Sequence, residues 1–181
     1  SSDVCSSDLM QELGLGSDPS TLSITYTLSG TTEWTRNYAA YCQQMWEKIL
    51  GVKVELDFNE WGTFQSKTNN GEFQIAMMTW SIDYDDPMAM MEVFAGGSNM
   101  VPVFWQNEQY DSLVAQARKE MDEKTRVDLY KQAENILLAE DCVISPNVNE
   151  CTHSYYYQYV KNYNKLASST SGLKYVDTSA R

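Results

Sequence analysis

An apolar, strand-like segment that ends on a tryptophan and runs into several carboxylates is the feature of this chain best suited to bind a ligand. Residues 71–80 have the sequence GEFQIAMMTW, and residues 81–87 continue it with SIDYDDP. Loops at strand ends in α/β proteins are exposed while the strand holds them in place, so ligands are commonly bound there. An indole beside a fixed carboxylate suits a ligand with an apolar body and a cationic group. The same spacing also fits a solvated acidic turn, because Asp and Pro are common turn formers.

Patterns for catalysis or metal binding are weaker. The single histidine, His153, has no recognisable nucleophile motif near it. A calcium loop that starts at Asp83 would need Gly and Glu at its sixth and twelfth positions, where the chain has Met88 and Phe94. Glu60 and Asp83 could form the carboxylate pair of a glycoside hydrolase, but no feature of the sequence indicates the required separation. We therefore expect binding without catalysis, and no metal or cofactor.

Composition narrows the classes of protein. The chain has 181 residues, of which 43% are hydrophobic and 12% aromatic, and this supports a folded core. Its formal charge of −12, from 13 basic and 25 acidic residues, makes nucleic acid a poor partner, because no basic stripe can displace counterions from phosphate. No apolar run approaches the length that spans a membrane.

The first nine residues, SSDVCSSDL, look foreign to the rest of the chain. They are what a common sequencing-library adapter encodes when it is translated in one frame. We expect residues 1–9 to be an artefact of that origin, joined to a longer reading frame. The absence of a visible signal peptide then carries no information.

The first half of the chain alternates strands and helices. Strands are expected at residues 23–28, 52–58 and 73–80, and helices at 31–50 and 60–69. Thr31 or Thr32 can cap the first helix, and Gly51 can end it. Its buried face is expected to carry the large apolar residues Trp34, Tyr38, Tyr41, Met45, Trp46 and Ile49. This order predicts a parallel or mixed sheet with helices on its faces.

The second half is predicted to be mainly helical. A short helix opens at Pro87, and two longer helices cover about residues 108–120 and 124–139, the second capped by Asp122. The inward positions expected on these two helices are Tyr110, Leu113, Val114, Ala117, Val127, Tyr130, Ala133 and Leu137. Strands are expected again at residues 142–146 and 173–176.

An ordered set of short motifs between about residues 22 and 175 carries a resemblance to a known family. The set comprises Leu50-Gly-Val52, Glu60-Trp61, Gly71-x-Phe73, Trp80-x-x-Asp83-Tyr84-x-Asp86-Pro87, Asn99, Tyr110-Asp111, Arg126, Leu129-Tyr130, Ala133-Glu134 and Pro146. On these residues the chain strongly resembles the family 5 solute-binding proteins of ABC importers, the oligopeptide- and dipeptide-binding group.

The resemblance implies an α/β fold of the periplasmic-binding-protein type (type II), in which a mixed sheet is flanked by helices. Residues 10–151 would form part of the C-terminal ligand-binding lobe. Residues 152–181 would cross the hinge and return a strand to a first lobe that is largely missing from the chain. The expected partners are a peptide and the permease subunits of the importer. The protein would be an extracytoplasmic monomer, free in the periplasm or lipid-anchored at the outer face of the membrane.

The same resemblance implies roles for individual residues. Asp83 would pair with the N-terminal ammonium group of a peptide, and Trp80 would line the same cleft. Tyr84, Trp105 and Asn99 are further candidates for ligand contact, although for Asn99 a role in shaping its loop is favoured. Asp85 and Asp86 are expected to act as turn and helix-start residues instead. Some oligopeptide-binding relatives carry an arginine where this chain has Met77, which leaves the length of the ligand open.

Two other functions fit the same residues. An oligosaccharide receptor on this scaffold could stack sugar rings on some of the five tryptophans. A glycoside hydrolase could use an acidic, aromatic cleft. Substitution of Asp83 by asparagine separates the first alternative from a peptide receptor, because a sugar site should tolerate the loss of charge better.

Overall fold

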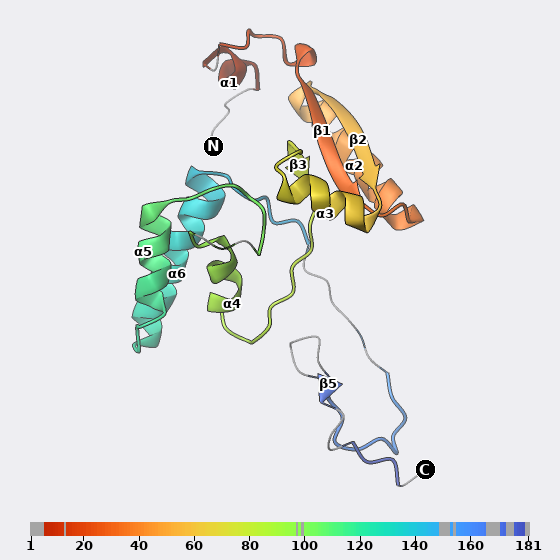
Figure 1. Ribbon diagram of the computed structural model, residues 1–181, viewed down its shortest axis with the longest axis vertical. Helices are drawn as coiled ribbons and strands as arrows, with labels where there is room; N and C mark the ends of the chain where they lie inside the picture. The colour runs from red at the N-terminus through yellow and green to blue at the C-terminus, as the bar shows by residue number, and fades with distance from the viewer. Residues whose placement is uncertain are drawn as a thin grey trace. The chain divides into compact units, whose positions relative to one another are not determined.

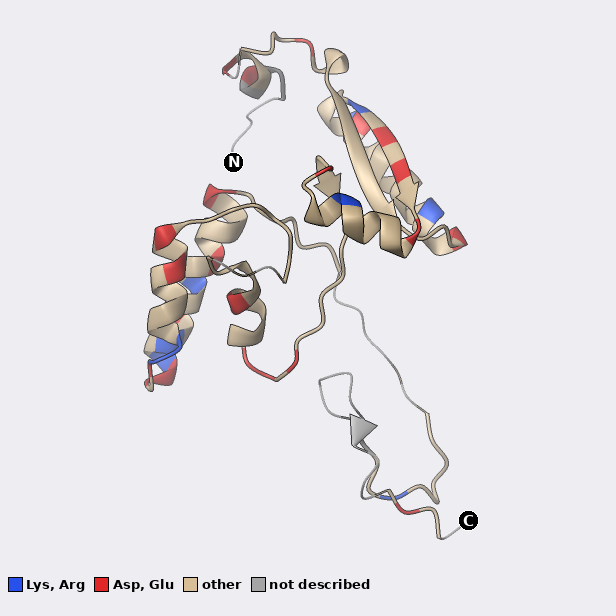
Figure 2. Ribbon diagram, viewed as in Figure 1, with Lys and Arg blue, Asp and Glu red and all other residues tan. Residues whose placement is uncertain are grey.

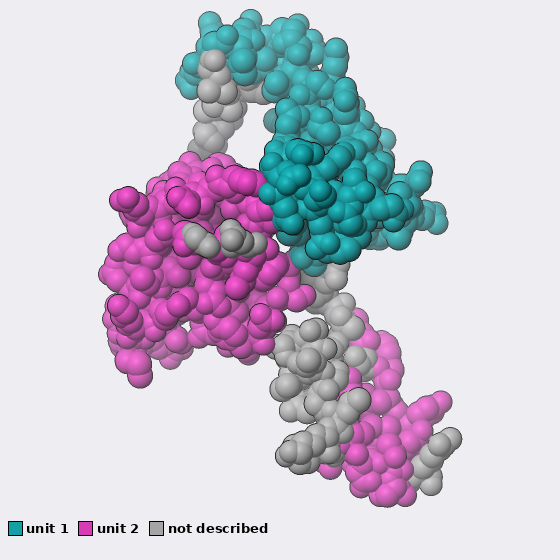
Figure 3. Space-filling model, viewed as in Figure 1, with its two compact units in different colours: residues 1–79 teal, residues 80–181 magenta. Residues whose placement is uncertain are grey.

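The computed structural model describes residues 6–12, 14–96, 98, 100–148, 153, 155–165, 171–172 and 176–179. The chain divides into two compact units, residues 1–79 and residues 80–181 (Figure 3). Each unit has a hydrophobic core of its own. The acidic loop of residues 81–87 belongs to the second unit.

The first unit is built on a three-stranded parallel sheet with strand order β2-β1-β3 (Figure 1). Its elements in chain order are α1 (Ser6–Glu12), η1 (Pro19–Thr21), β1 (Ser23–Ser29), α2 (Glu33–Leu50), β2 (Lys53–Asn59), α3 (Trp61–Asn69) and β3 (Ile75–Ala76). Tyr26 of β1 meets Trp46 of α2, whereas the next residue, Thr27, lies on the side that faces Lys67 of α3. Successive strand residues point to opposite faces, so α2 and α3 cover the two faces of the sheet.

Helix α2 begins and ends as the sequence predicts. The Thr32 hydroxyl accepts a hydrogen bond from the Thr35 N–H at 3.1 Å. Gly51 ends the helix with a φ of 73°, a left-handed conformation that glycine adopts without a steric penalty. The buried residues of the helix are Thr35, Ala39 and Cys42.

The predicted buried face of α2 is partly wrong. Trp34, Tyr41 and Ile49 are 59%, 61% and 66% exposed. Apolar residues cover a wide sector of this helix, and the core on the sheet includes only the part of the sector that contains Tyr38, Ala39, Cys42 and Trp46. Periodicity identified the sector correctly but could not show how much of it the sheet covers.

Strand β3 is shorter than the predicted strand at residues 73–80. Only Ile75 and Ala76 pair with β1, and the Met77 N–H adds one hydrogen bond to the Thr27 carbonyl oxygen at 3.1 Å. Among the described residues β3 has a partner on one side only. An edge strand of this kind receives half the ladder hydrogen bonds of a central strand, which allows the segment to leave the sheet early.

The second unit contains a helical hairpin and several short elements. These are α4 (Met88–Met91), η2 (Glu92–Phe94), α5 (Glu108–Ala117), α6 (Glu123–Asn135), the π-helical turn η3 (Ile136–Glu140), β4 (Asn164–Lys165) and β5 (Ser171–Gly172). Helices α5 and α6 lie side by side, and the core forms between them and α4 (Figure 1).

The predicted helices of the second unit are confirmed, with one error in their packing. All four inward positions predicted for α5 are buried, as are Tyr130, Ala133 and Leu137 further along the chain. Val127 is 38% exposed and was wrongly placed in the core. The Asp122 cap is confirmed, because its carboxylate accepts a hydrogen bond from the Thr125 N–H at 2.9 Å.

The strand predicted at residues 142–146 does not form. Cys142, the second residue after η3, adopts a left-handed φ of 48°, and the Val143 N–H donates to the Leu137 carbonyl oxygen at 2.9 Å. Val143 and Ile144 pack against the core of the unit without a strand partner among the described residues. Of the last predicted strand, only Val176 belongs to the described part of the chain.

Candidate functional site

The loop of residues 81–87 enters α4 and carries the candidate ligand-binding aspartates. Figure 2 shows acidic residues along this loop. Trp80, at its start, is half-buried and packs against the core of the second unit. Asp83 and Asp85 are exposed, and neither carboxylate forms a hydrogen bond or ion pair with any residue that the structure describes. Both are therefore available to a cationic ligand.

Asp86 anchors the end of the loop. Its Oδ1 accepts hydrogen bonds from the Met88 N–H at 2.8 Å and from the Tyr130 hydroxyl at 3.1 Å. Its Oδ2 lies 3.3 Å from Nη1 of Arg126. The prediction that Asp86 starts a helix is confirmed, since the Met88 N–H is one of the free donors in the first turn of α4. The structure adds that α6 holds the same carboxylate.

Tyr84 anchors the middle of the loop. Its hydroxyl donates to Oε1 of Glu92 at 2.8 Å, and Oε2 of Glu92 forms an ion pair of 2.8 Å with Nη2 of Arg118. Partial burial and the hydrogen bond to the Glu92 carboxylate together raise the pKa of the Tyr84 hydroxyl to about 12. The hydroxyl therefore remains a hydrogen-bond donor at any physiological pH.

Trp105 lies in a packed environment. Its indole N–H donates to Oδ2 of Asp141 at 2.8 Å, and its ring meets the edge of Tyr110 at a centroid distance of 5.0 Å. Asn107 donates to the same Asp141 oxygen at 2.9 Å, so Asp141 joins the segment before α5 to the end of η3. Contact between Trp105 and a ligand stays a prediction. Asn99, the other candidate on a loop, lies outside the described residues.

Gly96, close in sequence to Asn99, is held tightly by α5. Its N–H donates to Oδ1 of Asp111 at 2.6 Å, and an added Cβ would collide with Oδ2 of the same carboxylate. Gly96→Ala is expected to reduce the free energy of unfolding by about 0.5–1.5 kcal/mol, because the Asp111 carboxylate must shift and lose its hydrogen bond to the Gly96 N–H. Urea denaturation of the chain measures this change.

Gly62 provides the matched control, because a Cβ there meets no atom within 4 Å. Gly62→Ala in α3 should leave the unfolding free energy unchanged or raise it by about 0.5–1 kcal/mol, since alanine favours the helix. Equal effects at the two glycines would contradict the collision at Gly96.

Sequence reasoning found the loop but missed the residues that support it. Glu92 and Arg118 are 26 residues apart in the chain and no local pattern links them. Arg126 and Tyr130 offered a signal, because residues four apart lie on the same face of a helix and can bind one group together. Their shared partner, Asp86, is 44 residues from Tyr130 and could not be identified from sequence.

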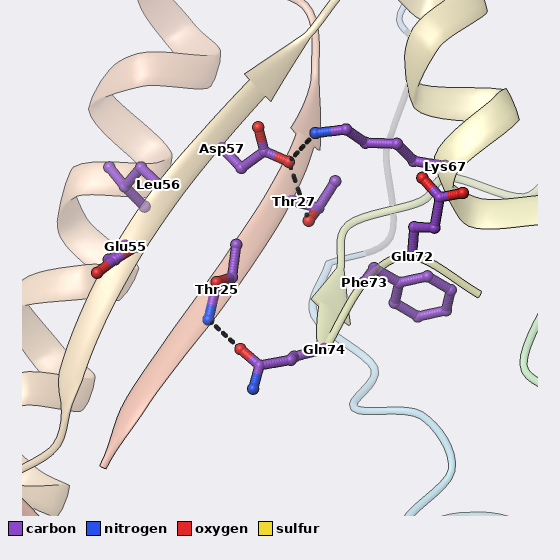
Figure 4. A pocket seen from close by; sticks show the side chains of 9 residues that line it. All are labelled: Thr25, Thr27, Glu55, Leu56, Asp57, Lys67, Glu72, Phe73 and Gln74. Atoms are coloured by element: carbon purple, nitrogen blue, oxygen red, sulfur yellow. Dashed lines mark hydrogen bonds and ion pairs between the residues drawn. The ribbon is translucent and has the colours of Figure 1, made fainter. Parts of the chain in front are cut away.

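A second candidate is the hollow on the face of the sheet in the first unit, with a volume of about 560 Å³ (Figure 4). Asp57 accepts hydrogen bonds there from Lys67 at 2.8 Å and from Thr27 at 3.4 Å. Gln74 uses its side-chain oxygen to accept from the Thr25 N–H at 2.6 Å. The Lys67 hydrogen bond, with others from Asn59 and Thr27, lowers the pKa of Asp57. Because the central carboxylate is already satisfied, this hollow is a weaker ligand site than the loop.

The residues that the structure describes contain neither a metal-binding cluster nor a membrane-spanning helix. No group of three or more His, Cys, Asp or Glu side chains in this part of the chain could hold a metal ion together. None of its helices combines the length and apolar character needed to cross a bilayer.

A parallel sheet covered by helices on both faces gives the first unit an α/β architecture. Among solved structures, a periplasmic oligopeptide-binding protein of Borrelia burgdorferi matches with a TM-score of 0.68 and 27% identity, over 76% of this chain and 27% of that one. The predicted α/β, periplasmic-binding-protein-like fold is therefore confirmed; the described three-stranded sheet is parallel.

The family follows from sequence comparison. The model of the bacterial extracellular solute-binding proteins, family 5 (middle part), matches residues 6–102. The oligopeptide-binding protein OppA of Bacillus subtilis is 35% identical over 136 residues, which are 72% of this chain and 24% of OppA. The dipeptide-binding protein DppE of the same organism is 38% identical over 122 residues, 67% of this chain and 22% of DppE. The chain belongs to family 5 of the bacterial extracellular solute-binding proteins and spans about a quarter of the length of these relatives.

Proposed function

We propose that this chain is part of the peptide-binding component of an ABC importer. In this proposal Asp83 binds the N-terminal ammonium group of the peptide, and Trp80 contacts the ligand beside it. The observation that carries the proposal is the exposed Asp83 carboxylate, which has no partner among the described residues and lies on a loop that Tyr84 and Asp86 fasten to the helices. The names of the relatives, oligopeptide- and dipeptide-binding proteins, support the class of ligand.

The remaining parts of the proposal concern the organisation of the chain and the place where the receptor works. Residues 10–151 contribute to the C-terminal lobe, and residues 152–181 cross the hinge and return to the first lobe, whereas residues 1–9 derive from an adapter. The receptor works as a monomer outside the cytoplasm, free in the periplasm or lipid-anchored, and delivers peptide to the permease subunits. It binds its ligand without catalysis.

Peptide binding by such a site has a simple physical basis. A hydrogen bond between a carboxylate and an ammonium group contributes roughly 1.5–3 kcal/mol. Pairing with the backbone of an extended peptide adds affinity that does not depend on the peptide sequence. Closure of two lobes around the ligand is the hinge motion that binding proteins of this kind use.

The proposal is tested by changing the ligand and measuring its binding to the full-length receptor, expressed from the intact gene. Isothermal titration calorimetry compares one tripeptide with a free N-terminus and the same tripeptide after N-acetylation. We expect the free amine to bind roughly tenfold to a hundredfold more tightly, as the loss of one charge-assisted hydrogen bond requires. Equal affinities would contradict the role of Asp83.

The alternatives are tested in the same preparation. The relatives reported above lend no support to an oligosaccharide receptor or a glycoside hydrolase. Titration with neutral oligosaccharides is expected to give no heat of binding, and incubation with peptides or glycosides is expected to leave them intact. Turnover of either class of compound would overturn the proposal of binding without catalysis.

A further inference from the structure

The two anchors of the loop share one arrangement of side chains, a tyrosine hydroxyl and an arginine on the same carboxylate. Tyr84 and Arg118 both bind Glu92, with donor–acceptor distances of 2.8 Å each. The second set consists of Tyr130 and Arg126 on Asp86, at 3.1 and 3.3 Å. The loop contributes the tyrosine to the first set and the carboxylate to the second.

Both arginines come from the same end of the helical hairpin. Arg118 caps the C-terminus of α5, and Arg126 lies near the beginning of α6, so both flank the turn that joins these helices. Figure 2 shows basic residues at this end of the hairpin. The loop of residues 81–87 is therefore supported at two points by one rigid element.

The two arginines also determine which carboxylates in and near the loop are paired. Four acidic residues lie within ten positions of the chain, namely Asp83, Asp85, Asp86 and Glu92. Arg118 pairs with Glu92 and Arg126 with Asp86, whereas Asp83 and Asp85 pair with no residue in the described part of the chain. Without the arginines, Glu92 and Asp86 would carry uncompensated negative charge beside the loop and would attract a cation in competition with Asp83.

We propose that Arg118 and Arg126 are positioning residues for ligand recognition, which restrict the binding of a peptide ammonium group to the exposed part of the loop. This inference rests on the proposed peptide-binding function. Loss of an arginine leaves an uncompensated carboxylate beside the loop. The affinity for any cationic peptide then rises, whereas the preference for a free N-terminus over an internal lysine falls.

The test is carried out with the full-length receptor. Two peptides are compared by calorimetry, one with a free N-terminus and one N-acetylated with an internal lysine. We expect Arg126→Gln to bind the acetylated lysine peptide about threefold to tenfold more tightly, the size of one uncompensated charge near the surface. Binding of the free-amine peptide should stay equal or increase by a smaller factor, so the ratio of the two affinities falls.

Compensating substitutions distinguish positioning from simple structural damage. In Asp86→Asn/Arg126→Gln the arginine and the carboxylate that it neutralises are removed together, so no additional charge is left to compete. We expect the ratio of the two affinities to return to within twofold of the wild type. Arg126→Lys, which keeps the charge, should also preserve this ratio. The same logic applies to Glu92→Gln/Arg118→Gln, which tests the other anchor if the Arg126 variants do not fold.

Arg36 supplies the matched control. It lies in the first unit, where its Nε donates to the Thr31 carbonyl oxygen at 3.1 Å. Arg36→Gln changes the net charge by the same amount as Arg126→Gln and is expected to keep the wild-type affinity ratio.

The outcomes separate this inference from the proposed function. If Asp83→Asn removes the preference for a free amine but Arg118→Gln and Arg126→Gln keep it, the positioning role is wrong and peptide binding through Asp83 stands. An arginine variant that weakens both peptides equally, without recovery in the double variant, likewise overturns the positioning role. If Asp83→Asn itself keeps the preference, the proposed function fails and this inference fails with it.

Discussion

Tyr110→Ala is expected to lower the free energy of unfolding by about 3–5 kcal/mol, the range for removing a buried aromatic side chain. Tyr110 is completely buried, its ring packs against Trp105, and its hydroxyl donates to the Met91 carbonyl oxygen at 2.7 Å. Loss of the ring opens a cavity between α5 and α4 and leaves this carbonyl oxygen without its donor. Small domains are stable by only about 5–15 kcal/mol, so this loss is a large part of the stability that such a unit can have.

Urea denaturation followed by tryptophan fluorescence measures this effect, and two variants serve as controls. Tyr110→Phe keeps the ring and should cost only about 0.5–1.5 kcal/mol, the net contribution of one hydrogen bond. Tyr41→Ala removes a tyrosine that is 61% exposed on α2, and its effect should stay within about 0.5 kcal/mol. A Tyr110→Ala chain with the same urea midpoint as Tyr41→Ala would show that the second unit does not have this core.

The difference between Tyr110 and Tyr41 also shows what sequence periodicity can predict. Both residues lie at apolar positions with helical spacing, and both were predicted to be buried. In α5 the prediction is correct because α6 and α4 contact the whole apolar stripe. In α2 the apolar sector is wider than the surface that the sheet offers, so Tyr41 stays exposed. Periodicity identifies the apolar face of an element, whereas its burial depends on the neighbours present.

Strands were predicted less well than helices for a related reason. A helix forms its hydrogen bonds within one segment, and local signals such as Thr32, Gly51 and Asp122 fix its ends. A strand needs a partner, and residues 73–80 and 142–146 have strand-like composition without full pairing among the described residues. β1 and β2, which pair along seven residues each, were predicted nearly to the residue.

The candidate site shows the same division between local and long-range information. Asp86 was predicted from its position before Pro87 to start a helix, and this role depends only on neighbours in sequence. Its contacts with Arg126 and Tyr130 depend on how α6 packs, so the sequence could not reveal them. These contacts hold the loop at Asp86, three residues after Asp83. They therefore help to explain why the Asp83 side chain stays exposed.

Asp83→Asn is expected to weaken the binding of a free-amine peptide to the full-length receptor roughly tenfold to a hundredfold, as the loss of one charge-assisted hydrogen bond predicts. Asparagine has nearly the same shape and keeps one oxygen acceptor, so the change removes charge and little else. Asp83 is exposed and has no partner among the described residues, and the substitution should therefore leave the urea midpoint unchanged. Asp85→Asn is the matched control and should bind within about threefold of the wild type, because removing a surface charge that does not contact the ligand has a small effect.

The pH dependence of binding gives a second, independent measure of the same contact. A peptide α-amino group has a pKa of about 7.7–8.0 in water, and pairing with the Asp83 carboxylate raises it in the complex. The contribution of the contact is then complete below about pH 7.7 and is lost as the pH rises through the raised value. In Asp83→Asn the pKa rises less on binding, so the affinity should fall less between about pH 7.5 and pH 10. An N-acetylated peptide should show no such decline with either receptor. Identical pH profiles for the wild type and Asp83→Asn would mean that another group binds the ammonium group. Equal binding of a neutral sugar to both proteins would favour the oligosaccharide receptor instead.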